Sequence, residues 1–243
     1  MKALIFDIRL NSLFSIRIPF TWQSALTYPL LPPSAVIGML ANALQRYKNN
    51  KHPLDYLSLL ESYIKWAGSR LITPCVVKSY TTSAIVKWED KLGGKFTNAL
   101  GRQYGFAKKI RIMAILENNK ELIKDLILAL KTTPLTCGDS ESLVTVENIE
   151  ITEARENTFF SGNVIETDFG VPFELENMEV LSGGMIYLVH EKCEKKGKKF
   201  PLRSYILPIK EEQGILKHIK LEIKLKKDAK TYCLENGQKV IIF

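Results

Sequence analysis

Two segments of the chain combine cationic and aromatic side chains. Lys78 and Tyr80 alternate with small residues, so both would lie on one face of a strand. Residues 102–111 contain no carboxylate but several cations and rings: Arg102, Tyr104, Phe106, Lys108, Lys109 and Arg111. Cations neutralise phosphates and aromatic rings stack on unpaired bases, so both segments favour binding of single-stranded nucleic acid. The structural alternative is that Tyr104 and Phe106 anchor a loop on the core while the cations are solvated.

The formal charge changes sign twice along the chain, although it sums to +8. Residues 1–136 hold 19 Lys and Arg against 8 Asp and Glu, residues 137–185 hold 1 against 11, and residues 186–243 hold 14 against 7. A strongly basic first part suits a polyanion such as nucleic acid, whereas phosphates would repel the acidic middle. Two other interpretations stay open: each block is an ordinary solvated surface, or the acidic segment is a protein-interaction surface.

The residue types that support catalysis or metal binding are sparse. The histidines lie far apart in sequence, at His52, His190 and His218, whereas metal-independent cleavage of RNA needs an acid and a base beside one 2′-hydroxyl. The cysteines show no metal-ligand spacing: Cys75, Cys137, Cys193 and Cys233. Phosphate-binding, dinucleotide-binding and nucleophile motifs are absent from the sequence. We therefore expect no catalytic residue, no metal site and no cofactor.

Composition indicates an ordinary globular protein, with 46% hydrophobic and 25% charged residues. Its apolar runs fall short of the ~18 residues needed to span a bilayer, and its first residues lack the cleavage region of a signal peptide. We expect a cytoplasmic protein without membrane contact. A length of 243 residues allows one large domain or two small ones.

The N-terminal elements begin with a strand over residues 3–10, with Arg9 on one face, and a second strand piece over residues 13–20. In the run YPLLPPSAVIGMLANAL, residues 28–44, prolines keep the chain extended, and Pro33 then suits the opening of a helix. Its apolar residues recur at helical spacing: Ile37, Leu40, Ala41 and Leu44. Because glycine destabilises a helix, we expect Gly38 to mark the close approach of another backbone.

The next elements are read from periodicity and composition. We expect a helix over residues 54–67 that stops at Gly68, strands or a long hairpin over 70–88, a long loop over 90–106, a strand over 107–117, and a helix over 119–131 capped by Asn119. The order strand, helix with a second helix inserted, two strands, helix and strand is the split βαβ order of the ferredoxin-like fold.

The predicted fold class is therefore α+β, with a ferredoxin-like domain over residues 1–155 and a smaller, β-rich C-terminal region over residues 156–243. Short strands are expected in the second region at residues 185–190, 203–207, 221–225 and 239–243. The lysine-rich residues 191–200 are expected to form an exposed basic hairpin or loop.

Several of these features together resemble a known protein family. They are the first strand, the segment with Phe14, Arg17 and Pro19, the YPLLPPSAVIG element and the CGDSESLV segment at residues 137–144. This combination resembles the fifth family of CRISPR-associated proteins, here called Cas-five, within the RAMP superfamily. The resemblance implies an RRM-like RAMP domain at the N-terminus, and a thumb-like projection at the loop over residues 90–106.

The resemblance is greatest to type I-A variants, and implies a non-catalytic subunit of a type I interference (Cascade) complex. Such a subunit would hold the 5′ handle of the CRISPR guide RNA, cap the filament of backbone (family seven) subunits, and contact the large (family eight) subunit. Some family members cleave precursor guide RNA, so a metal-independent endoribonuclease is the alternative function.

The resemblance also adds candidate RNA contacts at Arg9 and Arg17, with Trp22 and Gln23 in the link that follows. In the segment 137–142, Gly138, Ser140 and backbone amides suit phosphate binding and resemble a RAMP loop. Its carboxylates would oppose phosphate, so a purely structural turn is an equally good interpretation.

Overall fold

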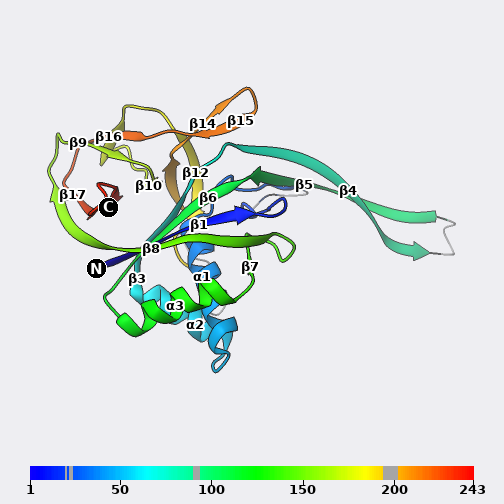
Figure 1. Cartoon of the computed structure of the whole chain (residues 1–243). Coiled ribbons are helices and arrows are strands. Elements are labelled where there is room, and N and C mark those ends of the chain that lie inside the picture. The colour runs from blue at the N-terminus through cyan, green and yellow to red at the C-terminus, as the bar shows by residue number, and fades with distance from the viewer. Residues whose placement is uncertain (20, 22–23, 90–93, 194–201) are drawn as a thin grey trace.

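A seven-stranded sheet forms the centre of the structure, a computed structural model that describes residues 1–19, 21, 24–89, 94–193 and 202–243 (Figure 1). Of residues 82–89 and 94–100 only the backbone is described. The strands pair in the order β18-β17-β8-β1-β6-β3, and β7 pairs with β8. Their bounds are β1 (Lys2–Leu10), β3 (Ile64–Leu71), β6 (Lys109–Leu116), β7 (Leu135–Thr136), β8 (Leu143–Phe159), β17 (Ala229–Leu234) and β18 (Lys239–Ile242).

Helices α1 (Pro33–Lys48), α2 (Pro53–Tyr63) and α3 (Lys120–Thr132) lie together on one side of this sheet (Figure 1). Alternate residues of β1 face them, and these residues share one hydrophobic cluster with the buried stripes of α1 and α3: Leu4, Phe6, Ile8, Leu40, Leu44, Leu126 and Leu130. As predicted, Pro33 opens α1, and the Asn119 side chain caps α3 by accepting from the backbone N–H of Leu122 at 3.1 Å.

Four strands and two helices come in the order β1, α1, β3, β6, α3 and β8, with α2 inserted after α1, although β3 begins at Ile64, within the helix expected over residues 54–67. In the sheet these strands lie as β8-β1-β6-β3, and each neighbouring pair is antiparallel. The strand β8 passes residue 155 without interruption, and pairs with β1 in its first part and with β17 in its second. The two predicted regions therefore share one continuous strand.

Between β3 and β6 the chain forms a long hairpin of β4 (Cys75–Glu89) and β5 (Gly94–Ala107), which reaches away from the sheet (Figure 1). The prediction of a loop over residues 90–106 was therefore wrong for residues 94–106. Among the described strands, β5 pairs outside the hairpin only with β2 (Ser24–Ala25), and β4 only with β15. Most of the hairpin thus has no neighbouring strand among those described, and periodicity in a sequence arises where one face of an element packs on a core.

The C-terminal region is β-rich, as predicted. Two small sheets pair in the orders β10-β13-β12 and β11-β16-β9, and a hairpin of β14 and β15 joins β4. Their bounds are β9 (Val164–Thr167), β10 (Val171–Pro172), β11 (Met178–Val180), β12 (Met185–His190), β13 (Leu202–Leu207), β14 (Ile209–Glu212), β15 (Ile215–His218) and β16 (Leu221–Leu225). All four predicted strands are present. The predicted basic loop at residues 191–200 lies largely outside the described residues, as do Trp22 and Gln23.

Three local predictions were wrong. Helix α2 ends at Tyr63 rather than at residue 67, because Ile64 already pairs with Leu116 as the start of β3. Residues 13–19 of the strand piece predicted over 13–20 are not a strand: they form isolated bridges, from Phe14 to Gly105 and from Arg17 to Thr27. No described atom lies within 4 Å of a Cβ added at Gly38, so no backbone of the described residues packs closely against this glycine. The glycine still destabilises α1 by about 1 kcal/mol relative to alanine.

Residues 14–16 lie between two glycines that allow unusually close contact. A Cβ added at Gly105 would lie 2.5 Å from the Phe14 ring, and one at Gly138 would lie 2.3 Å from the carbonyl oxygen of Ser15. Gly138 also has a φ of 89°, which strains other residues. Phe14 and Gly105 exchange backbone hydrogen bonds of 2.9 and 2.8 Å. These contacts fix the segment against both the base of the hairpin and the turn before β8.

We predict that Phe14→Ala lowers the free energy of unfolding by about 3–5 kcal/mol, because the fully buried ring fills the space above Gly105. Urea unfolding followed by circular dichroism measures this change. Leu13→Ala, at the neighbouring exposed position, is the matched control and should have little effect. Equal effects of the two substitutions would contradict the anchoring role of Phe14.

Candidate nucleic-acid interface

The register of the hairpin brings together four residues that are far apart in sequence. Lys78 lies opposite Tyr104 and Tyr80 lies opposite Arg102, so all four side chains lie on one face. The rings of Tyr80 and Tyr104 meet edge to face with centroids 5.8 Å apart, and the Arg102 guanidinium lies 4.9 Å from the Tyr104 centroid. We call Lys78, Tyr80, Arg102 and Tyr104 the hairpin face.

The hairpin face is accessible to a ligand, since Tyr80 is 49% exposed. Phe106 is 51% exposed beside it, so this ring does not anchor the segment on the core as the structural alternative required. The anchor at this place is Phe14, which is buried against Gly105. Exposed rings beside cations form the kind of surface on which unpaired bases stack.

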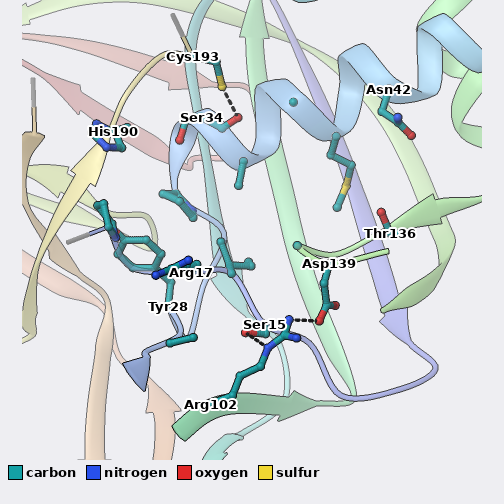
Figure 2. Close-up of a pocket in the computed structure, with 18 of the residues that line it drawn as sticks. Ser15, Arg17, Tyr28, Ser34, Asn42, Arg102, Thr136, Asp139, His190 and Cys193 are labelled. Carbon is teal, nitrogen blue, oxygen red and sulfur yellow. Dashed lines mark hydrogen bonds and ion pairs between the residues drawn. The ribbon is translucent and has the colours of Figure 1, made fainter. Parts of the chain in front are cut away.

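A cavity of about 950 Å³ adjoins the hairpin face (Figure 2). One side is α1, which contributes Ser34, Gly38 and Asn42 at successive turns. The other sides are formed by residues within 15–19 and 24–28, the middle of β5, the turn before β8, and His190 with Cys193. Arg102 belongs to both the cavity and the hairpin face. Arg17 also lines the cavity, and Asp139 is the one carboxylate among its described lining residues.

Arg102 is held in place by three groups. Its Nη2 donates to Asp139 Oδ2 at 2.5 Å, and its Nε lies 3.5 Å from Ser15 Oγ (Figure 2). Its guanidinium also packs on the Tyr104 ring. This arrangement neutralises Asp139, so the carboxylate in the cavity is matched by a cation before any ligand binds. Preorganised guanidinium groups bind phosphate with little loss of side-chain entropy.

The segment 137–142 forms a structural turn between β7 and β8. The Ser142 hydroxyl lies within hydrogen-bonding distance of two acceptors, the carbonyl oxygen of Leu13 at 2.8 Å and the carboxylate of Asp139. The N–H of Cys137 donates to the carbonyl oxygen of Ser142 at 2.8 Å. Of the two predicted contacts in this turn, Gly138 lines the cavity and Ser140 is exposed at the turn itself.

The remaining predicted cations lie on or near the central sheet. Arg9 and Lys109 flank Glu147 at 3.7 and 2.6 Å, and Arg111 forms a two-pronged ion pair with Asp7 at 2.7 and 2.9 Å. Lys108 is exposed. The three paired cations are not part of the hairpin face, and binding a phosphate would require them to exchange or share their carboxylate partners.

The ion pair of Asp7 and Arg111 is buried on the carboxylate side, where Asp7 is 3% exposed. Burial alone would raise the pKa of Asp7, but hydrogen bonds from Arg111 and Asn148 and the charges of Arg111 and Arg70 outweigh it and hold the pKa below the ordinary 3.8. Asp7 therefore stays ionised at neutral pH and fixes Arg111 in the sheet.

The three histidines have different surroundings. His52 caps α2 by accepting from the N–H of Leu54 at 3.3 Å, and His218 Nε2 lies 3.0 Å from Asp168 Oδ1. Only His190 lines the cavity. The described residues include no cluster of His, Cys, Asp or Glu able to hold a metal ion. In the same part of the chain, no helix is long and apolar enough to cross a membrane.

Sequence reasoning missed the cavity residues on α1 and in the C-terminal region. Ser34 and Asn42 belong to a helix whose pattern was read for its buried stripe, and His190 was judged from its distance in sequence to the other histidines. The one signal in the sequence was Gly38. This glycine was expected to destabilise the helix, but it was attributed to the close approach of another backbone and not to a cavity.

We predict that Asp7→Asn lowers the free energy of unfolding at pH 7 by about 3 kcal/mol, because Arg111 loses its charged partner. Because the folded pKa of Asp7 lies below its unfolded value of about 3.9, the carboxylate stabilises the protein above that pH, and this contribution is lost as the pH falls through the folded pKa. The difference in free energy of unfolding between wild type and Asp7→Asn should therefore become smaller in acid.

Urea unfolding at a series of pH values tests this prediction. Glu153→Gln, which removes an exposed ion pair of 2.8 Å with Lys2, is the control and should change stability little at any pH. The prediction would be contradicted if the free energies of unfolding of wild type and Asp7→Asn differed by the same amount down to pH 2.

The fold is shared with solved structures of low sequence identity. A crystal structure of a CRISPR protein from Archaeoglobus fulgidus matches with a TM-score of 0.60 and 19% identity, over 99% of this chain and 98% of that chain. A second match is to a chain in the cryo-EM structure of the Type III-B Cmr-beta bound to cognate target RNA and AMPPnP. Its TM-score is 0.50 and its identity 10%, over 92% of this chain and 86% of that chain. No curated protein matches the chain.

A family model gives a more specific result than these shared folds. The model described as CRISPR-associated protein (Cas_Cas5) matches residues 5–192. This range contains the hairpin face, α1 and nearly all residues that line the cavity. The resemblance to Cas-five inferred from the first strand, the YPLLPPSAVIG element and the CGDSESLV segment is thereby confirmed. The chain belongs to the CRISPR-associated protein (Cas_Cas5) family.

Proposed function

We propose that this protein is a non-catalytic subunit of a CRISPR effector complex that binds guide RNA on the hairpin face. The observation that carries the proposal is the pairing register, which places the exposed Tyr80 and the half-buried Tyr104 on one face with Lys78 and Arg102. Family membership supports a role in CRISPR interference. The Cmr-beta complex, which was solved bound to a target RNA, adds support from a chain of similar fold.

In this proposal the hairpin face binds unpaired nucleotides by stacking and charge. One or two bases stack on Tyr80 and Tyr104, and Lys78 and Arg102 contact the flanking phosphates. Stacking on an aromatic side chain contributes about 1–3 kcal/mol per base, and cation contacts make the affinity fall with rising salt. Neither interaction requires a particular base, so the register of the RNA would depend on its shape and its ends.

The more specific role that we propose is recognition of the 5′ handle of the guide RNA in a type I, I-A-like Cascade complex. The protein would cap the filament of family-seven backbone subunits and contact the family-eight large subunit. A ferredoxin-like N-terminal domain agrees with the antiparallel strand order β8-β1-β6-β3. The hairpin of β4 and β5 would be the thumb-like projection, since it reaches well away from the sheet (Figure 1).

The acidic segment is a weaker candidate for the working surface. Several of its carboxylates already have cationic partners within the fold: Glu147 pairs with Lys109 and Arg9, Glu153 with Lys2, and Glu156 with Lys230. These pairs reduce the excess negative charge that a basic partner would recognise.

A metal-independent endoribonuclease is the second candidate, because His190 lines the cavity that adjoins the hairpin face. The same cavity offers little to complete an acid and base pair. Burial raises the pKa of Tyr28 to about 12, so its phenol stays protonated at neutral pH, and it donates to the carbonyl oxygen of Leu188.

We predict that Tyr80→Ala and Tyr104→Ala each weaken binding of labelled CRISPR repeat RNA about 5- to 100-fold, because each removes a stacking ring. Fluorescence anisotropy at two salt concentrations measures the affinity. Tyr47→Ala removes an exposed ring from α1 outside the cavity and should bind like wild type. Wild-type affinity in both hairpin variants would contradict the proposed site.

We also predict that wild-type protein leaves the repeat RNA intact in EDTA. A denaturing gel after prolonged incubation measures this, with His190→Ala run in parallel. Discrete cleavage by wild type that is lost in His190→Ala would contradict the non-catalytic role and establish the nuclease alternative.

A further inference from the structure

Gly38 has no structural explanation within the described fold. It lies in the middle of α1, where alanine would favour the helix, and an added Cβ would meet nothing within 4 Å. It is also one of the residues that line the large cavity. The described fold thus does not require a glycine at this position on the cavity wall. A ligand that occupies the space above Gly38 would explain it.

The neighbours of Gly38 show which chemistry this ligand has. Ser34 and Asn42 lie one turn of α1 to either side, so a hydroxyl and an amide flank the bare helix backbone (Figure 2). Arg17 and the ion pair of Arg102 with Asp139 line the same cavity, so the formal charge of its described lining is positive. Cations beside small groups that both donate and accept hydrogen bonds suit the phosphates and 2′-hydroxyls of RNA.

The cavity is also continuous with the hairpin face, because Arg102 belongs to both. Its volume of about 950 Å³ lies at the upper end of the range for ligand pockets, about 300–1,000 Å³. An RNA strand whose bases stack on Tyr80 and Tyr104 could therefore pass Arg102 and continue into the cavity without leaving the basic surface.

We propose that the cavity holds sugar-phosphate backbone of the bound RNA, and that Gly38 lets this backbone lie directly against α1. The proposal rests on the proposed function and deepens it. The hairpin face binds bases, whereas the α1 wall binds ribose and phosphate. Contact between Asn42 and a 2′-hydroxyl would make this second part of the site distinguish RNA from DNA.

The test compares Gly38→Ala and Gly38→Leu with wild type for affinity and thermal stability. Gly38→Ala should raise the Tm by about 2–4 °C, because the helix gains stability without a clash. The same variant should weaken binding of labelled repeat RNA, and Gly38→Leu should weaken it at least about tenfold. Ser58→Leu places the same side chain on α2, away from the cavity, and should leave affinity unchanged.

A second readout uses DNA of the same sequence as the probe. Wild type should prefer RNA, and Gly38→Leu and Asn42→Ala should reduce this preference. Tyr104→Ala reports separately on the hairpin face. Wild-type affinity and preference in the Gly38 variants, with weakened binding in Tyr104→Ala, would overturn the inference and leave the proposed function standing. Weakened binding in the Gly38 variants alone would overturn the hairpin site instead, and absence of RNA binding by wild type would overturn both.

Discussion

The close contact of residues 14–16 with two glycines is the constraint on which the candidate site depends. Without a side chain at Gly105 the Phe14 ring can lie directly on β5, and without one at Gly138 the carbonyl of Ser15 can approach the turn before β8. The segment is thereby fixed between the hairpin and the turn, and Arg17 follows it at the edge of the cavity. The segment 14–17, the base of the hairpin and the turn before β8 are distant in sequence but thus lie together in one small region.

Arg102 is the residue that joins the two halves of this region. Its position on β5 puts it opposite Tyr80 and against Tyr104, while Asp139 and Ser15 hold its guanidinium at the cavity. The cations of the central sheet are used differently. Arg111 is matched by the buried Asp7, whose pKa is held below its ordinary value, so this pair stabilises the fold. The cations of the basic first part therefore differ in their surroundings: those of the central sheet are paired within the sheet, whereas Arg102, although paired with Asp139, lies at the accessible hairpin face and cavity.

The sequence predicted those elements that pack against a single core. Helices α1 and α3 and strand β1 carry apolar residues at the spacing of one buried face, and Asn119 caps α3 as its position indicated. Strand β5 could not be predicted in this way, because it belongs to a ribbon that pairs mostly with its own partner strand and is rich in glycine. The end of α2 at Tyr63 depends on pairing of Ile64 with β6, a contact that local periodicity does not contain.

The candidate site was predicted in part. Lys78 with Tyr80 and Arg102 with Tyr104 were chosen as separate pairs, and only the register of the hairpin shows that they form one face. The cavity depends on tertiary contacts among α1, the turn before β8 and β12, so no local pattern indicates it. Gly38 was the one cavity residue that the sequence singled out, because a glycine that weakens a helix can be recognised from the sequence alone.

The central claim is that RNA runs across the hairpin face and into the cavity beside α1. Ultraviolet cross-linking of the protein to repeat RNA, followed by mass spectrometry of the cross-linked peptides, tests it most directly. We expect cross-links at Tyr80 or Tyr104 and in the peptides that carry Arg17 and α1. Cross-links confined to the central-sheet peptides around Arg9, Lys109 and Arg111, or to the acidic segment, would contradict it.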